Sequence, residues 1–103
     1  MIKTISYRPI VIDFLLGREY DEGIISHYKS MIIDELMGFE IVVQNVDRFI
    51  KLVKKSKTKD DAKESVSRTF NLSLHQAEII LATKISDIAK LNLQIIRNAI
   101  KSL

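Results

Sequence analysis

The side chains that could do chemistry are few, and their spacing does not form a catalytic site. Neither His27 nor His75 has neighbours three or four residues away that would complete a convincing metal site. His75 falls in the first turn of a predicted helix, where solvent exposure is the simplest expectation. The acidic pairs Asp21-Glu22 and Asp60-Asp61 are sequence neighbours, which do not face each other on a helix. These residues therefore predict neither a metal centre nor an acid–base pair.

Other catalytic patterns are also missing from the sequence. No serine lies in a Gly-x-Ser-x-Gly turn, and three isolated glycines cannot build a phosphate-binding loop. Cysteine is absent, which excludes disulfides, zinc fingers and thiol chemistry. A DNA-cleaving tyrosine needs both a basic pocket and metal-binding carboxylates, and the sequence does not supply both for Tyr7, Tyr20 or Tyr28. We expect a non-catalytic protein without a cofactor or a metal.

Composition limits the fold class. The chain has 103 residues, of which 47% are hydrophobic and 28% charged, so it can form one domain with a core. Three glycines and one proline are too few for the many turns of a β-sandwich or barrel. The net charge of +3 is compatible with nucleic acid but not diagnostic of it. The scarcity of turn residues therefore predicts an all-α protein. With no long apolar run and no secretory signal, the expected location is the cytoplasm.

The clearest helical pattern lies between residues 25 and 53. Apolar residues alternate there at steps of three and four, with only Lys29 interrupting, at Ile25, Ile32, Leu36, Phe39, Val43, Val46, Ile50 and Val53. This is a heptad stripe of about four heptads. It predicts either a core-facing helix of a small bundle or a long coiled-coil arm, and periodicity does not choose between them. The arm would use Leu36, Phe39, Val43, Val46, Ile50 and Val53.

Capping residues predict the elements that follow. Lysines suit the negative, C-terminal end of the helix predicted over residues 25–53. Lys54, Lys55 and Lys57 could contact phosphate, although such a run more commonly marks a solvated helix end. Thr58 begins a helix of about residues 60–68, which Asn71 ends. Ser73, with Gln76 three residues later, begins a helix from Leu74 to about Ile85. Ser86 or Asp87 is expected to cap the last helix.

The first 23 residues permit two interpretations. Pro9 suits the first position of a helix. Gly17 and Gly23 would each cost roughly 1 kcal/mol inside a helix. The segment is therefore either a separate helix of about residues 9–20 followed by a break or a weakened start of the arm. Residues 2–7 could form a short extended piece.

Four motifs in order resemble the A subunits of bacterial type IIA topoisomerases. The run from Phe70 to Leu81 is similar to the Phe-Gly-Leu-Ser/Thr-x-x-Gln-Ala-x-x-Ile-Leu segment found in the A subunits of DNA gyrase and topoisomerase IV. Gly38-Phe39 and Asn45-Val46-Asp47 match the Gly-Leu and Asn-Ile-Asp of these proteins at the same separation. The other matching residues are Ile50, Leu52, Val53, Ile85, Ile88, Ala89, Lys90 and Leu91. The resemblance covers about residues 36–97.

This resemblance implies the region called the C-gate, the exit gate for transported DNA. It implies a long helical arm (about residues 9–55), a globule at its tip (58–85) and the start of an antiparallel return helix (87–103). The cleavage and ATPase machinery of the family lies outside this segment. Two globules would meet in a homodimer, with DNA bound only weakly. The expected dimer contacts are Phe70, Leu72, Leu74, Gln76, Ile79 and Ile80.

Several alternatives remain open from the sequence. Phe70, Leu72 and Ile80 could instead form the core of the globule. The chain could be a stand-alone helical adaptor that binds a partner protein, such as a topoisomerase subunit, in a groove lined by Val43, Ile50, Ile88 and Ile95. A small nucleic-acid-binding protein is a third possibility, although no helix-turn-helix signature supports it.

Overall fold

The computed structural model describes residues 11–19 and 22–103. Within these ranges the chain forms eight α-helices and no strand, which confirms the all-α prediction. The expected roles of Pro9 and of residues 2–7 lie outside the described residues. The helices are α1 (Val11–Leu15), α2 (Glu22–His27), α3 (Lys29–Gln44), α4 (Val46–Lys55), α5 (Lys59–Phe70), α6 (Leu74–Leu81), α7 (Ile85–Ile88) and α8 (Leu93–Ser102).

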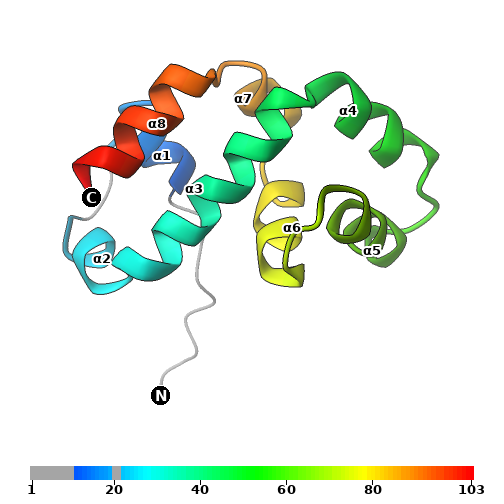
Figure 1. Cartoon of the computed structure of the whole chain (residues 1–103), viewed down its shortest axis with the longest axis horizontal. Coiled ribbons are helices and arrows are strands. Elements are labelled where there is room, and N and C mark those ends of the chain that lie inside the picture. The colour runs from blue at the N-terminus through cyan, green and yellow to red at the C-terminus, as the bar shows by residue number, and fades with distance from the viewer. Residues whose placement is uncertain (1–10, 20–21) are drawn as a thin grey trace.

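Helix α3 is the centre of the arrangement. It packs against α1, α2 and α8 on one side and against α4 and α6 on the other (Figure 1). Helix α8 runs back along α3 in roughly the opposite direction, and Arg97 Nε donates a hydrogen bond of 2.8 Å to Glu40 Oε2 between them. Helices α5 and α6 pack on each other, and α4 packs on α5. The chain therefore forms two groups of helices that share α3.

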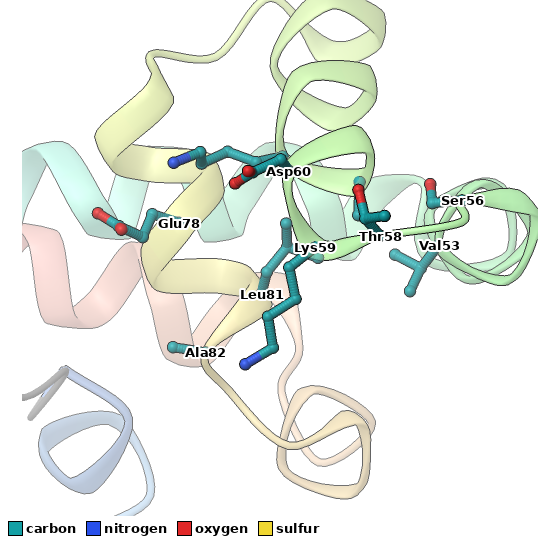
Figure 2. Close-up of a pocket in the computed structure, with 10 residues that line it drawn as sticks. Val53, Ser56, Thr58, Lys59, Asp60, Glu78, Leu81 and Ala82 are labelled. Carbon is teal, nitrogen blue, oxygen red and sulfur yellow. The ribbon is translucent and has the colours of Figure 1, made fainter.

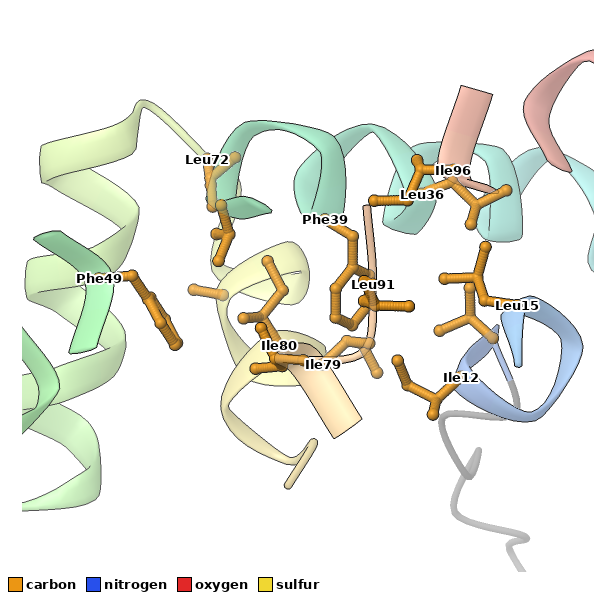
Figure 3. Close-up of a cluster of buried hydrophobic side chains, with 14 of the residues drawn as sticks. Ile12, Leu15, Leu36, Phe39, Phe49, Leu72, Ile79, Ile80, Leu91 and Ile96 are labelled. Atoms are coloured by element: carbon orange, nitrogen blue, oxygen red, sulfur yellow. The ribbon is translucent and has the colours of Figure 1, made fainter. Parts of the chain in front are cut away.

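One hydrophobic core joins the two groups (Figure 3). Phe39 of α3 is fully buried and lies among Ile79, Ile80 and Leu91. On one side the core continues to Ile12, Leu15 and Ile96, and on the other to Phe49 and Leu72. Burial of these apolar side chains is the main favourable contribution to folding, at roughly 25 cal/mol per Å² of apolar surface removed from water.

The helix predicted over residues 25–53 is divided in the structure. Asn45 has φ −133° and ψ 38°, outside the helical region, and its side-chain Nδ2 donates a hydrogen bond of 2.9 Å to Ile41 O. Such a side chain competes with the backbone for helical partners. The uninterrupted arm is therefore wrong, because α3 ends at Gln44 and α4 begins at Val46.

The break also changes which residues of the predicted stripe are buried. Leu36 and Phe39 lie fully in the core, as expected. Along α3 the burial continues to Val42 rather than to Val43, and on α4 it falls on Phe49 rather than Ile50. Ile25 and Ile32 are buried as well, and the remaining four stripe residues are half-buried against the core: Val43, Val46, Ile50 and Val53. The bundle interpretation therefore describes α3 better than the coiled-coil interpretation.

The other predicted boundaries are partly confirmed. Thr58 caps α5, because its side chain accepts from Asp61 N at 3.0 Å. Helix α1 ends at Leu15, two residues before Gly17, whose φ is +73°. The first helix is therefore separate from α3, as one alternative had it, but it ends at Leu15 rather than near residue 20. The last boundary is wrong: neither Ser86 nor Asp87 caps the final helix, since both lie in α7. Asn92 caps α8, with its side chain accepting from Ile95 N at 2.9 Å.

Candidate functional site

The expected dimer residues surround the corner between α5 and α6. Asn71 adopts the left-handed conformation with φ 56°, and Leu72 N then donates to Ser67 O at 2.9 Å. This geometry ends α5 in the manner of a Schellman motif. The following helix begins with a capping box: Gln76 N donates to Ser73 Oγ, and Ser73 N donates to Gln76 Oε1. The corner therefore has a fixed backbone.

Most of the expected interface faces inward. Phe70, Leu72, Gln76, Ile79 and Ile80 are all at most 8% exposed and belong to the packing of this chain itself. In the structure Phe70, Leu72 and Ile80 are thus part of the core, which is the alternative that the sequence left open for them. Leu74, the first residue of α6, differs because it is 55% exposed. Of the six residues, it alone presents a large apolar surface to solvent.

A close contact between α3 and α6 positions this corner. A side chain at Gly38 would place its Cβ 3.3 Å from Gln76 Cβ and 3.4 Å from Ile80 Cδ1, so glycine permits the two helices to approach. Gln76 Nε2 donates to the backbone oxygen of Asp34 at 2.7 Å. One side chain therefore both caps α6 and joins it to α3.

A buried carboxylate beside this contact was not anticipated from the sequence. The Glu35 side chain is fully buried on α3, and its Oε2 lies 2.7 Å from Nε2 of His75 on α6. The His75 side chain is 40% exposed, so its ring reaches from the surface to a buried group. The expectation of a merely solvent-exposed His75 is wrong. The available signal was the position of Glu35, immediately before a stripe residue.

The predicted phosphate-contacting lysines are exposed. Lys54 and Lys55 end α4, and Lys57 lies in the connection to α5. In the described part of the chain, none of the three makes an ion pair within 4.0 Å. Arg48 also lies on α4, and its guanidinium carbon is 5.8 Å from the centre of the Phe70 ring. The sequence analysis did not single out this residue for binding.

A pocket of about 590 Å³ lies where α4, α5 and α6 meet (Figure 2). Val53 from α4 and Leu81 from α6 form part of its apolar lining. Lys59 and Asp60 come from the first turn of α5, and Glu78 from α6. The lining therefore has both signs of charge. None of the residues expected to line the adaptor groove lines this pocket: Val43, Ile50, Ile88 and Ile95. Ile88 is only 2% exposed, so it offers almost no surface to a partner.

An ion pair joins two distant segments near α1. Arg18 donates to both carboxylate oxygens of Asp87, at 2.8 Å and 3.2 Å. These hydrogen bonds lower the pKa of the Asp87 carboxyl and raise the pKa of the Arg18 guanidinium. Arg18 also lies 3.8 Å from Asp13. The pair connects the end of α1 to α7.

The lowered pKa of Asp87 predicts a pH-dependent contribution to stability. Its folded-state pKa lies below the unfolded value of about 4, so its contribution is present above that value and is lost as the pH falls through the folded pKa. Asp87→Asn should therefore lower the melting temperature at neutral pH, and the difference from wild type should close below about pH 4. Circular-dichroism melts across this range provide the measurement. A difference in melting temperature that stays constant with pH would contradict this prediction. The control is Glu78→Gln, because Glu78 has no ion pair in the described ranges.

Two further searches of the structure concern metals and membranes. Among residues 11–19 and 22–103, no group of three or more histidine, aspartate or glutamate side chains is placed to bind a metal ion. None of the helices in these ranges combines the length and apolar character that crossing a bilayer requires.

Three proteins with similar sequences are A subunits of DNA gyrase. The chain is 39% identical over 59 residues to the DNA gyrase A subunit of Metamycoplasma arthritidis. The aligned region covers 57% of this chain and 7% of that relative. The chain is 32% identical to the DNA gyrase A subunits of Fibrobacter succinogenes (55% of this chain, 6% of the relative) and of Borrelia hermsii (66% and 8%). The chain thus spans less than a tenth of these relatives. No protein-family model and no solved structure matches it. The resemblance predicted from the motifs is confirmed.

Proposed function

We propose that this chain, which is similar to a segment of the DNA gyrase A subunit, is a non-catalytic dimerisation module corresponding to the exit gate of a type IIA topoisomerase. In this proposal it works in the cytoplasm and cleaves no DNA itself. The observation that carries the proposal is the similarity at 32–39% identity to three gyrase A subunits. Because the chain spans only 6–8% of each relative, DNA cleavage and supercoiling are not assigned to it.

The corner between α5 and α6 supports this role. The capping box at Ser73 holds the backbone, and Leu74 projects from it with 55% of its surface exposed. An apolar side chain on a rigid support can bury surface in a twofold contact with little loss of conformational freedom. We therefore propose Leu74 as the dimer contact, with Phe70, Leu72, Gln76, Ile79 and Ile80 supporting the corner from inside.

The dimer is tested by light scattering over a concentration series. Wild type should approach twice the chain mass of 11.8 kDa as concentration rises. Leu74→Asp should shift the association midpoint to at least about tenfold higher concentration. The substitution removes an apolar contact from the proposed interface, and a loss of about 1.4 kcal/mol in binding free energy changes the dissociation constant tenfold. The control is Ile85→Asp on α7, since Ile85 is 46% exposed and lies outside the proposed contact.

The outcome also separates the second candidate function. A wild-type chain that stays monomeric at every concentration would contradict self-association. It would favour the adaptor, which binds a different protein. Met37, Leu74 and Ile85 are among the exposed large apolar side chains that it could offer. Equal weakening by Leu74→Asp and Ile85→Asp would place the contact elsewhere.

A further inference from the structure

One face of α6 connects the exposed Leu74 to the pocket between α4, α5 and α6. At 100° per residue, Leu74, Glu78 and Leu81 lie within about 60° of the helix circumference. Leu74 and Glu78 are exposed and Leu81 is half-buried, whereas Ala77 and Ile80 are buried. Glu78 and Leu81 also line the pocket. The apolar side chain and the pocket therefore belong to one continuous surface of the chain.

The pocket has the size and the lining to receive an apolar side chain. Its volume of about 590 Å³ lies within the range of about 300–1,000 Å³ that is typical of ligand sites. Three helices contribute its apolar lining, which consists of Val53, Ala62, Leu81 and Ala82. Val53 and Ala82 lie on opposite sides of this space (Figure 2). An inserted side chain would therefore contact apolar groups on several sides.

The charged rim of the pocket is complementary to the surface around Leu74. Lys59 and Lys63, four residues apart on α5, line the pocket together with Asp60 and Glu78. In the described ranges none of these four side chains makes an ion pair within 4.0 Å. Glu78 follows Leu74 by one helical turn on the same face. A second copy that inserts its Leu74 therefore brings a carboxylate toward two lysines.

We propose that two copies of this chain pair about a twofold axis, so that Leu74 of each copy enters the pocket of the other. Leu74 and Leu81 are seven residues apart, which is about 10 Å along α6. An axis that crosses α6 near Glu78 places Leu74 opposite the partner's Leu81, with the two α6 helices antiparallel. The contact is isologous, because each copy uses the same surface. This inference rests on the proposed dimer and adds the site that Leu74 occupies.

A direct contact between the two Leu74 side chains is the simpler alternative, but it buries less apolar surface. Leu74 is the first residue of α6, so an axis through it would leave the pocket open to solvent. The side chains that contribute most to binding occupy pockets from which water is excluded. Insertion provides such a site, because it covers Leu74 and the half-buried Val53 and Leu81 together.

The test is charge complementation between two variants of the full chain, followed by light scattering. Leu74→Asp removes the inserted side chain, and Ala82→Lys obstructs the pocket at an exposed position. Each variant alone forms a dimer with two defective contacts, so each should associate at least about tenfold more weakly than wild type. A mixed dimer has one unchanged contact and one in which the new carboxylate faces the new ammonium. The equimolar mixture should therefore associate at least about tenfold more tightly than either variant.

The matched control is Ala89→Lys, the same substitution at an exposed alanine that follows α7 and does not line the pocket. It should associate as wild type does. Circular dichroism verifies that all of the variants are folded, so that a loss of association reports on the contact.

The possible failures have different signatures. A wild-type chain that stays monomeric would overturn both the proposed dimer and the inserted contact. If wild type dimerises and Ala82→Lys has no more effect than Ala89→Lys, the dimer remains and Leu74 does not enter the pocket. A mixture that associates no better than the separate variants would contradict reciprocal insertion. A wild-type mass that rises beyond two chains would show that the contact is not twofold.

Discussion

Phe39→Ala should lower the free energy of unfolding by about 3–5 kcal/mol, because truncation of a buried phenylalanine removes its burial energy and leaves a cavity. Phe39 has no exposed surface, and it lies on the helix that both groups of helices share. In a domain of this size, each kcal/mol corresponds to about 4–8 °C in melting temperature. Urea unfolding followed by circular dichroism measures the loss directly.

The control for this prediction lies two residues away on α3. Met37 is 50% exposed, so Met37→Ala should change the stability by no more than about 0.5 kcal/mol. If Phe39→Ala were equally mild, Phe39 would not occupy the centre of a single core. If the two groups of helices unfolded in separate transitions, they would not share one cooperative unit.

Ile80→Asp should destabilise the chain by more than Phe39→Ala does, at least about 5 kcal/mol, which is comparable with the whole stability of a small domain, and should therefore leave most of it unfolded. Ile80 is 1% exposed and lies opposite Gly38, so an aspartate would bury a charge where α3 and α6 approach closely. The loss of circular-dichroism signal measures the unfolded fraction. Residual helix with normal urea cooperativity would contradict the predicted burial.

Leu74→Asp is the matched comparison for this substitution. It introduces the same acid in the same helix, but at an exposed first position, where negative charge is favourable near the helix N-terminus. It should therefore remain folded. The pair also shows why Ile80 is unsuitable for testing association: its replacement removes the fold, whereas replacement of Leu74 tests the surface.

The most predictable features are those fixed by neighbouring residues. The caps at Thr58 and Ser73 each depend on a side chain and a backbone N–H three residues later, so the sequence contains all of the necessary information. The end of α5 at Asn71 is similar, because asparagine tolerates the left-handed conformation. The motifs shared with gyrase A subunits are also readable from sequence.

The features that sequence could not supply depend on distant partners. Nothing next to Glu35 indicates His75, forty residues later. The heptad stripe continues across Asn45 in sequence, whereas in the structure Asn45 leaves the helical conformation, and α4 packs on α5 while α3 packs on α8. The inward direction of Phe70, Leu72 and Ile80 likewise follows from the neighbours that α3 provides. Hydrophobic periodicity identifies an apolar face but not what covers it.

The Arg18–Asp87 ion pair joins residues 69 positions apart, and this separation affects how the chain folds during synthesis. The contacts among α4, α5 and α6 connect neighbours, so this part can assemble as soon as it leaves the ribosome. Helix α1 leaves earlier but packs against α8, the last of the described helices to be translated. Until α8 is translated, α1 and α3 therefore lack one of the helices that pack on them, and Leu15 and Leu36 lack Ile96 as a neighbour. We expect the apolar surface left uncovered over that interval to be of the kind that chaperones bind.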